Sequence, residues 1–404
     1  MSDQPHRVSR RTLLKTAAAA PLARVATRLP QTARSVVVVG AGAFGGWTAL
    51  HLLRAGARVT LVDAWGPGNS RASSGGETRI IRANYGADRV YVKFVARALQ
   101  LWRENQARWG RTLYRQIGCL WMAGKDDAGE KAAVPLMREA GLVVDELTVK
   151  DATARYPQIN FEDVNWVIYE RDAGYLTARL ACQAVMEGFV KEGGEYRQLS
   201  AKPGALKNGA LEHVLLSDGS TVSADQYVFA CGPWLGQVFP DAIGPRVSPT
   251  RQEVFFFGTD AGDHQFLEDR FPAWIDNTGH RFYGIPGNQF RGFKIADDTR
   301  GAPFDPTSGD RVASAAGVAA ARKYLSFRFP ALKNPPLLES RVCQYEQSPD
   351  ERFIIDRHPQ ADSVWLVGGG SGHGFKHGPA LGEWVSKLVM GEAKVDPFFA
   401  LGRF

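Results

Sequence analysis

Residues 35–63, SVVVVGAGAFGGWTALHLLRAGARVTLVD, begin with a run of β-branched residues, pass through a glycine-rich turn into a helical stretch, and end in a second apolar run. This order predicts a strand, a helix and a parallel second strand. Gly40, Gly42 and Gly45 have the G-x-G-x-x-G spacing. In that spacing the first glycine permits a tight turn, the second lets a pyrophosphate approach the backbone, and the third lets helix and strand pack closely. The stretch therefore predicts a Rossmann-like dinucleotide-binding unit.

Asp63 supports this prediction, because it ends the second strand at the distance where a carboxylate accepts hydrogen bonds from a ribose hydroxyl. A glycine-rich helix cap is the alternative explanation of the glycines, but it gives no reason for an acidic residue at that place. NAD and FAD both bind to this fold, so the motif alone leaves the choice between them open.

The segment that follows, NSRASSGGETRIIRANYG at residues 69–86, is rich in small side chains and places Arg79 and Arg82 three residues apart. Small residues let a chain run close against a long ligand, and paired arginines suit a carboxylate or an anionic ring. The alternative is a surface loop whose arginines are solvated.

The net charge of +7 over 404 residues is concentrated at the N-terminus. Within the first 34 residues one aspartate stands against seven basic residues: Arg7, Arg10, Arg11, Lys15, Arg24, Arg28 and Arg34. The rest of the chain is therefore nearly neutral and offers no basic face for nucleic acid. The twin arginines in SRRTLLKTAAAAPLA, followed by an apolar stretch, predict a twin-arginine export signal, with a disordered basic tail as the alternative. We expect a periplasmic or secreted protein, or on the alternative a cytoplasmic one.

The four cysteines are scattered without C-x-x-C spacing, so they predict neither a zinc site nor a disulfide framework: Cys119, Cys182, Cys231 and Cys343. A lone cysteine is usually a buried small residue, but Cys343 lies between an arginine and a tyrosine, each two positions away, which leaves a chemical role open. No stretch approaches the roughly 18 uninterrupted apolar residues of a transmembrane helix. We therefore expect no stable insertion in a membrane.

The secondary-structure pattern changes along the chain. Residues 90–118 have helical periodicity, whereas residues 250–296 form short alternating runs bounded by glycine and proline, which predict antiparallel strands. Lys294 lies inside one of these runs with apolar neighbours, so it points either to solvent or into a pocket. Near the C-terminus, a strand, a glycine loop and a helix from about Pro379 to Met390 return to the α/β pattern.

Five blocks of the sequence resemble the monomeric sarcosine oxidase and N-methyltryptophan oxidase family of the D-amino-acid-oxidase-like flavoproteins. They occur in the family's order and spacing: TRIIRANYG (78–86), PTRQEVFFF (249–257), YGIPGNQFRGFK (283–294), VCQYEQSPDERFIIDRHP (342–359) and GGSGHGFK (369–376). The resemblance implies an α/β fold with an FAD-binding Rossmann-like domain and a second, α+β substrate domain built on an antiparallel sheet. After the leader at 1–34, we expect the FAD-binding domain in 35–89, 145–240 and 340–404, and the substrate domain in 90–144 and 241–339.

The resemblance also implies which residues hold the cofactor. The family's covalent attachment cysteine falls on Cys343, whose thiolate adds to the 8-methyl carbon of the flavin and needs positive charge nearby. The other residues expected beside the FAD are Gly40, Gly42, Gly45, Asp63, Thr78, Arg79 and Trp234. No metal is expected.

Other positions match substrate-binding and catalytic residues of the family. Arg82 and Lys376 match the pair that binds the substrate carboxylate, and Tyr283 matches an aromatic residue lining the amine pocket. The expected catalytic residues are Lys294, Arg79 and Tyr345. In the family the lysine promotes reaction of the cofactor with oxygen, the arginine lies against the flavin, and the tyrosine lines the amine pocket.

These roles imply FAD-dependent oxidation of an N-methyl or cyclic secondary amino acid to an imine that hydrolyses, with O2 reoxidising the flavin to give H2O2. The implied partners are a small amino acid or amine and O2, and the implied state is a monomer. Two alternatives stay open: an amine dehydrogenase that passes electrons to a quinone or carrier, and an exported flavoprotein without catalysis. Asp298 and Gly75 stand where the family has histidines, so the resemblance does not assign sarcosine as the substrate.

Overall fold

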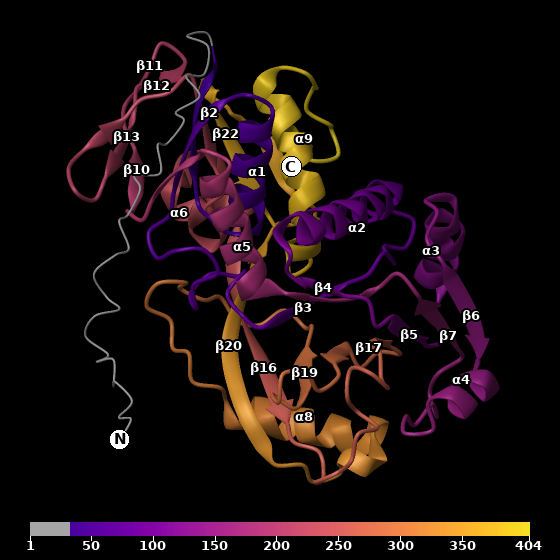
Figure 1. Cartoon of the computed structure of the whole chain (residues 1–404). Helices are drawn as coiled ribbons and strands as arrows, with labels where there is room; N and C mark the ends of the chain where they lie inside the picture. The colour runs from indigo at the N-terminus through magenta and orange to yellow at the C-terminus, as the bar shows by residue number, and fades with distance from the viewer. Residues whose placement is uncertain (1–32) are drawn as a thin grey trace, which may run out of the picture. The chain divides into compact units, whose positions relative to one another are not determined.

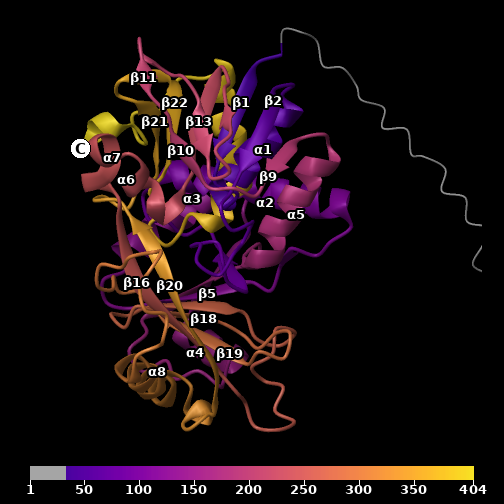
Figure 2. The ribbon, with the colours of Figure 1, turned by 90° about the vertical axis from the view of Figure 1, so that its left-hand side faces the viewer.

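The computed structural model describes residues 33–404, and from Arg34 onward the chain forms one compact unit (Figure 1). The expected export leader lies outside the described residues except for its last two positions. Within the compact unit, a six-stranded sheet and its helices occupy the upper part of the views in Figures 1 and 2, and an eight-stranded sheet occupies the lower part.

The six-stranded sheet has the order β21-β22-β15-β1-β2-β9 and is parallel except at β21. Its strands are β1 Ser35–Val39, β2 Arg58–Val62, β9 Glu195–Arg197, β15 Gln226–Phe229, β21 Ile354–His358 and β22 Ala361–Gly368. β1 lies inside this sheet, and Val36, Val37 and Val38 are almost fully buried. A parallel strand that is buried on both faces has no polar side, which explains the uninterrupted valine run. The predicted Rossmann-like unit is confirmed.

Helix α1 (Ala43–Arg54) packs against α5 (Ala178–Lys191) and α9 (Gly378–Met390), and α2 (Arg89–Trp109) packs against α9. Gly378 and Gly382 lie one turn apart on α9 and face Trp47 of α1. A Cβ added at these glycines would come within 2.6 Å and 2.5 Å of Trp47 atoms. Because interiors are close-packed, any side chain at either position would force the two helices apart.

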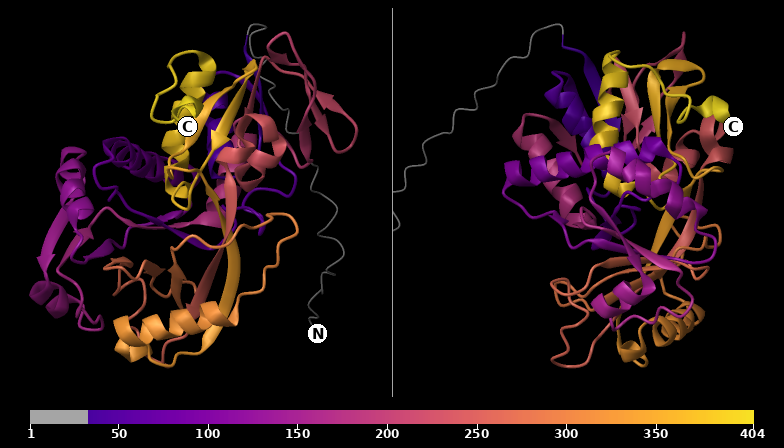
Figure 3. Two further views of the ribbon diagram at one scale, coloured as in Figure 1. Left: turned by 180° about the vertical axis from the view of Figure 1, so that it is seen from behind. Right: turned by 90° about the vertical axis from the view of Figure 1, so that its right-hand side faces the viewer.

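The eight-stranded sheet has the order β20-β16-β19-β18-β17-β5-β7-β6. Its strands are β5 Cys119–Ala123, β6 Val144–Thr148, β7 Trp166–Glu170, β16 Ser248–Phe257, β17 Ala273–Asn277, β18 Phe282–Ile285, β19 Phe293–Asp297 and β20 Leu337–Gln347. All neighbours are antiparallel except the pair of β17 with β5. Helix α8 (Ala315–Arg328) packs on this sheet and shares an aromatic core with it, including Trp274, Phe293 and Tyr324. Figure 3 shows α8 along the bottom of the molecule.

A small sheet of β3 (Thr78–Ile81), β8 (Gly174–Thr177) and β4 (Tyr114–Arg115) lies between the two larger sheets in Figure 1. It places the TRIIR segment, and with it Arg79 and Arg82, in the middle of the fold. The remaining described helices and strands are α3 Ala128–Glu139, α4 Val149–Arg155, α6 Leu235–Val238, α7 Pro240–Ile243, β10 Ala201–Pro203, β11 Leu206–Lys207, β12 Ala210–Leu211, β13 Val214–Leu216 and β14 Thr221–Val222. Short 3-10 turns include η1 Gly232–Trp234 and η4 Phe375–His377.

Sheet membership differs from the predicted domain ranges at two places. The ranges 145–240 and 340–404 are both predicted to belong to the FAD-binding domain. The first contains β7 and most of β6, and the second contains most of β20. All three strands belong to the eight-stranded sheet instead. The hydrophobic pattern of a strand records how it is buried but not which distant strand it pairs with.

The predicted helices are found with one change of length. The helix predicted over 90–118 ends at Trp109, because Gly110 adopts a left-handed conformation with φ of 62° and terminates it. The helix predicted from about Pro379 to Met390 is confirmed, with Gly378 as its first residue. None of the helices in residues 33–404 combines the length and the apolar character needed to cross a bilayer. Those same residues contain no group of three or more His, Cys, Asp or Glu side chains arranged to hold a metal ion.

Candidate active site

A cavity of about 740 Å³ lies at the carboxyl ends of four strands of the six-stranded sheet. Gly40 follows β1, Asp63 follows β2, Ala230 follows β15, and Gly370 lies just beyond β22, and all four residues line the cavity. The carboxyl ends of parallel strands are where open α/β sheets bind their ligands. The cavity is therefore the place for the dinucleotide that the glycine motif predicts.

Glycine is needed at the three positions of the motif for different structural reasons. Gly40 has φ of 106°, and a Cβ there would lie 2.3 Å from the carbonyl oxygen of Ala230; a Cβ at Gly45 would lie 1.9 Å from the oxygen of Gly40. At Gly42 an added Cβ would meet only Ser74 Oγ, at 3.3 Å. The protein's own packing therefore requires the first and third glycines, whereas the second keeps space open toward the cavity. Gly45 itself does not line the cavity.

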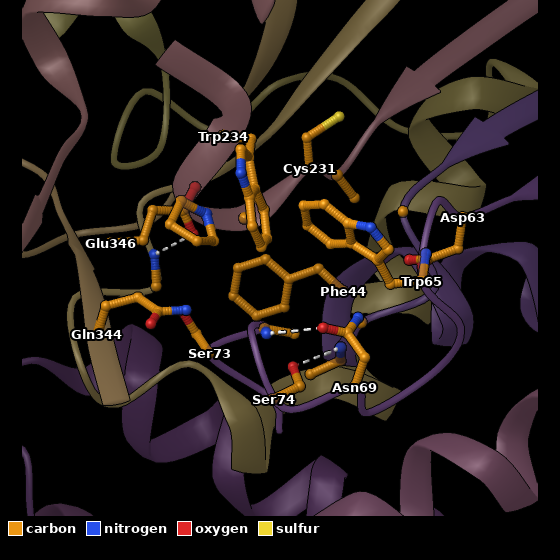
Figure 4. A pocket seen from close by; sticks show the side chains of 18 of the residues that line it. Phe44, Asp63, Trp65, Asn69, Ser73, Ser74, Cys231, Trp234, Gln344 and Glu346 are labelled. Atoms are coloured by element: carbon orange, nitrogen blue, oxygen red, sulfur yellow. Dashed lines mark hydrogen bonds between the residues drawn. The ribbon is translucent and has the colours of Figure 1, made fainter. Parts of the chain in front are cut away.

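Asp63 is held in place by backbone groups at the edge of the cavity. Its Oδ2 accepts a hydrogen bond from Ala41 N at 2.8 Å, and its Oδ1 accepts from the N–H groups of Trp65 and Gly66 at 2.9 and 2.7 Å. Burial raises the pKa of Asp63, although these three N–H groups stabilise its charged form. Figure 4 shows Trp65 next to Trp234 and Phe44, and the two tryptophan ring centroids are 5.0 Å apart.

Two buried polar atoms of cavity-lining residues have no partner among the described residues, Ser73 Oγ and Glu346 Oε1. Burial raises the pKa of Glu346 to about 7. A buried polar group without a hydrogen bond is costly, so these atoms indicate that a polar ligand completes the site. Together with the open space at Gly42, they fit a dinucleotide cofactor in this cavity.

A second cavity of about 650 Å³ lies beside the first. The residues that line both cavities are Arg79, Tyr283, Tyr345, Gly372 and Phe375. Arg82, Lys376 and Asp298 line the second cavity only. A cofactor in the first cavity and a substrate in the second would therefore meet at Arg79 and the two tyrosines.

Four basic side chains, of which Arg79 lines both cavities, lie at or near this junction without an acidic partner in the described residues. Arg79 donates to Ser73 O at 2.7 Å, Lys294 to Thr78 O at 2.8 Å, Lys376 to His373 O at 2.8 Å, and Arg82 to Asn84 O. Within residues 33–404 none of the four has a carboxylate oxygen inside 4.0 Å; Glu77, close in sequence, pairs with Arg291 and Arg341 instead. Because the described hydrogen bonds of these four side chains go to carbonyl, hydroxyl and sulfur groups and not to carboxylates, the junction favours anionic ligands.

Burial and mutual repulsion lower the basicity of the two lysines. The pKa of Lys294 is lowered to about 7, first by burial and then by the charge of Arg79. Burial, followed by the charge of Arg82, lowers the pKa of Lys376 well below its usual value. A bound carboxylate or an electron-rich ring would relieve both effects.

Two aromatic rings contact Arg82, and the buried carboxylate of Glu170, which the sequence does not predict, holds the groups around it. Its guanidinium carbon lies 4.1 Å from the ring centre of Tyr85 and 5.2 Å from that of Trp121. Glu170 accepts hydrogen bonds from Ala83 N at 2.6 Å and from Trp121 Nε1 at 2.8 Å, so it holds both the backbone beside Arg82 and one of the rings. Burial raises the pKa of Glu170.

A second unpredicted group of residues lies beside Arg82 and Lys376, which are both close to the ring of Tyr85. Tyr85 Oη lies 2.9 Å from His373 Nδ1 and 2.7 Å from His377 Nε2. Burial lowers the pKa of both histidines well below the usual value. This shift favours the neutral form of both imidazoles, of which only that of His373 lines the second cavity.

Cys343 is 8% exposed, lies on β20 and lines the first cavity. Arg79 Nη2 lies 3.5 Å from its sulfur. Cys231 lines the same cavity, but its sulfur lies near the carbonyl oxygen of Val39 and burial raises its pKa. Among the two cavity cysteines, only Cys343 has a cation beside it.

The remaining predicted residues are placed as follows. Trp234 lines the first cavity, where its Nε1 donates to Thr307 Oγ1 at 2.8 Å. Thr78 and Lys294 are buried behind the junction and line neither cavity. At Gly75 an added Cβ would lie 1.8 Å from the carbonyl oxygen of Asn69, so this loop conformation excludes a histidine there.

Comparisons with known proteins agree with this geometry. Residues 35–388 match the family model described as FAD dependent oxidoreductase. The chain is 30% identical to a monomeric sarcosine oxidase of Arthrobacter sp. (strain TE1826), covering 91% of this chain and 96% of that protein. It is 26% identical to an N-methyl-L-tryptophan oxidase of Salmonella heidelberg (strain SL476), covering 91% and 97%.

Among solved structures, an L-proline dehydrogenase from P. horikoshii superposes with a TM-score of 0.78 at 21% identity, covering 91% of this chain and 96% of that one. This likeness supports the fold. The family model spans most of the chain, and the sequence likeness to the two oxidases extends over nearly their whole length. The chain therefore belongs to the FAD-dependent oxidoreductase family and is a homologue of the sarcosine and N-methyl-L-tryptophan oxidases, which act on CH–NH groups.

Proposed function

We propose that this protein is an FAD-dependent oxidase of an N-methyl or cyclic secondary amino acid. It oxidises the amine to an imine, which water hydrolyses, and O2 accepts the electrons to give H2O2. The observation that carries the proposal is that Arg82 and Lys376, which have no acidic partner among residues 33–404, line a cavity that meets the dinucleotide cavity. An amino acid supplies the carboxylate that these two charges lack.

The residues have separate tasks in this proposal. When bound, FAD supplies the two-electron acceptor. Gly40, Gly42 and Asp63 hold the dinucleotide, as the space and the fixed carboxylate at the strand ends suggest. Arg82 and Lys376 bind the substrate carboxylate and thereby orient the amine toward the junction of the two cavities.

The test is turnover in air with a panel of N-methyl and cyclic amino acids. We expect each mole of substrate consumed to use one mole of O2 and give one mole of H2O2. Turnover that requires an artificial electron acceptor would instead establish the dehydrogenase alternative. Flavin-loaded protein that oxidises no amine with either acceptor would support the alternative without catalysis.

Replacing Arg82 with alanine should raise KM for an N-methyl amino acid about 10- to 100-fold, because a hydrogen bond to a charged group contributes about 1.5–3 kcal/mol. The flavin content should not change. The corresponding N-methyl amino acid amide has no carboxylate, so it should be a poor substrate that Arg82→Ala affects little. Arg89, an exposed residue that pairs with Glu139, gives the matched control Arg89→Ala. An equal loss on the acid and the amide would contradict the assigned role of Arg82.

We also propose that the flavin is bound covalently through Cys343. The neighbouring Arg79 stabilises the thiolate that forms the thioether. After acid precipitation, the yellow colour should stay in the pellet of the wild type and of Cys231→Ala, and it should move to the supernatant for Cys343→Ser. Colour in the supernatant of the wild type would show that the cofactor is not covalently held.

Export of the folded monomer by the twin-arginine route is a further part of the proposal, since the leader carries Arg10 and Arg11 side by side. Fractionation of a bacterium that expresses the full chain should find the protein in the periplasm or medium. Arg10→Lys/Arg11→Lys should keep it in the cytoplasm, and equal export of this variant would refute the signal. Gel filtration of the exported protein tests whether it is a monomer.

A further inference from the structure

Asp298 is the one predicted departure from the family pattern whose side chain lies in the second cavity. It follows β19, four residues after Lys294, and its side chain is exposed. Its Oδ1 accepts a hydrogen bond from Tyr345 Oη at 2.7 Å, and no hydrogen bond to Oδ2 is found in the described part of the chain. A carboxylate with an uncommitted oxygen therefore faces the space where a substrate binds.

The partner of Asp298 connects it to the place of reaction. Tyr345 and Tyr283 line both cavities, and their hydroxyl oxygens are 3.4 Å apart. A carboxylate only accepts hydrogen bonds, so the hydroxyl proton of Tyr345 points at Asp298. The lone pairs of the Tyr345 oxygen are then directed away from Asp298 and can accept a hydrogen bond from a substrate amine. Tyr345 itself is held by Gly372, where an added Cβ would lie 2.7 Å from the tyrosine ring.

The proposed reaction needs this connection, because an amino acid in neutral water carries a protonated amine, whose lone pair is blocked. We infer that Asp298 is the catalytic base of this site: it takes the proton of the substrate ammonium through Tyr345. The N–H bond of the ammonium breaks and its proton passes to the Tyr345 oxygen, while the Tyr345 proton passes to Asp298 Oδ1. The electron pair stays on the nitrogen, and the exposed carboxyl later releases its proton to solvent. This inference rests on the proposed function.

The charges around Asp298 favour such a transfer. The protein atoms around the carboxylate desolvate it and raise the pKa of Asp298, although the residue is open to solvent through the second cavity; Tyr345 and Arg82 act in the opposite direction. Lys376 on η4 also lowers the pKa, and Glu351, in the segment after β20, raises it. The other neighbours are Tyr283 on β18 and Arg281, whose carbonyl oxygen accepts from Asp298 N at 2.8 Å. For the substrate, the positive charges of Arg82 and Lys376 lower the pKa of a nearby ammonium and so promote its deprotonation.

A different use of Asp298 would be to bind a second positive charge on a larger, basic substrate. The position of Tyr345 favours the role of Asp298 as a base. Tyr345, the hydrogen-bond partner of Asp298, lies at the junction of the two cavities and not at the distal wall of the second one. The two uses predict different behaviour. A base acts on every secondary amino acid, whereas a second cation site affects only substrates that carry a second amine.

The test uses flavin-loaded protein mixed without oxygen with N-methylalanine, and it follows the loss of visible flavin absorbance as a function of pH. Asp298→Asn keeps an oxygen that accepts from Tyr345 but cannot take up a proton. At neutral pH we expect it to bleach about 100-fold more slowly than the wild type, in line with the contribution of a general base. The rate should recover at alkaline pH, where the free amine is already deprotonated. Tyr345→Phe interrupts the same path and should show the same alkaline shift, which keeps the test valid if Asp298→Asn does not fold.

Asp297→Asn is the matched control. This neighbour lines neither cavity, and its Oδ1 accepts from Thr299 N at 2.8 Å, which an asparagine oxygen can also do. It should bleach at the wild-type rate at every pH. An Asp298→Asn variant with the rate and pH profile of the wild type would overturn the inference. A loss confined to α-N-methyllysine, with N-methylalanine unaffected, would overturn it in favour of a second cation site. If the wild type bleaches with no secondary amino acid at any pH, the proposed function fails and the inference fails with it.

Discussion

Lys294→Met should slow the reaction of the protein with oxygen about 10²- to 10³-fold, the usual loss when one preorganised charge or donor is removed from a reacting centre. Lys294 is buried on β19 and its Nζ donates to Thr78 O, the same carbonyl that accepts from Arg79 Nη1 at 2.8 Å. When protonated it is a fixed positive charge with no acidic partner among residues 33–404, which suits the stabilisation of negative charge that develops on oxygen. The rate of bleaching by substrate without oxygen should change far less, since Lys294 does not line the second cavity, where the substrate is proposed to bind.

The pH dependence gives this prediction a second readout. The pKa of Lys294 is lowered to about 7, so the side chain is a cation below that pH and becomes neutral as the pH rises through it. The rate at which oxygen restores the flavin colour should therefore fall as pH increases through about 7 in the wild type. The Lys294→Met rate should be low and independent of pH in that range, and Lys294→Arg should retain the charge to higher pH. A rate for Lys294→Met equal to that of the wild type would remove Lys294 from the oxygen reaction.

Arg328→Met should lower the free energy of unfolding by about 3–5 kcal/mol, because it leaves a buried carboxylate without its counter-charge. The side chains of Arg328 and Asp276 are both fully buried. Arg328 donates to Asp276 Oδ2 through Nε at 2.9 Å and Nη2 at 2.7 Å, and Tyr324 Oη donates to the same oxygen at 2.6 Å. The network joins helix α8 to strand β17. Urea unfolding followed by fluorescence measures the loss.

Arg322→Met is the matched control for this effect. Arg322 is on the same helix and is half-buried, but its guanidinium donates to the carbonyl oxygen of Pro335 at 2.6 Å and leaves no carboxylate unpaired when removed. Arg322→Met should lower the free energy of unfolding by no more than about 1.5 kcal/mol, the net contribution of an ordinary hydrogen bond. The double variant Arg328→Met/Asp276→Asn should recover part of the loss, since the unpaired charge is gone. Equal losses for Arg328→Met and Arg322→Met would contradict the account of the buried pair.

The dinucleotide-binding unit was predictable because its reasons are local. The valine run of β1, the turn at Gly40 and the acid at Asp63 lie within one short stretch, and each has a physical cause that the structure displays. The pairing of β6, β7 and β20 into the eight-stranded sheet was not predictable in the same way. Their partners are distant in sequence, and an apolar alternation fits either sheet.

The same distinction between local motifs and distant contacts applies to the residues of the candidate site. Arg82 and Lys376 were identified through short motifs, and the structure brings them to one cavity from segments nearly three hundred residues apart. Glu170 was missed because a single glutamate at a strand end has no recognisable motif, and its importance comes from backbone groups of the distant segment that follows β3. The contact of Tyr85 with His377 was missed for the same reason. The only signal in the sequence was the repeated histidine around Lys376.

The measurement that tests the central claim most directly is anaerobic mixing of the flavin-loaded protein with N-methylalanine, with alanine and N-methylalanine amide as comparison compounds. If the two cavities form one site for a carboxylate-bearing secondary amine, N-methylalanine bleaches the flavin much faster than either comparison compound. Bleaching by the amide at the same rate would contradict the assignment of Arg82 and Lys376 to a substrate carboxylate. A flavin that no N-methyl or cyclic amino acid bleaches would contradict the claim that this protein oxidises secondary amino acids.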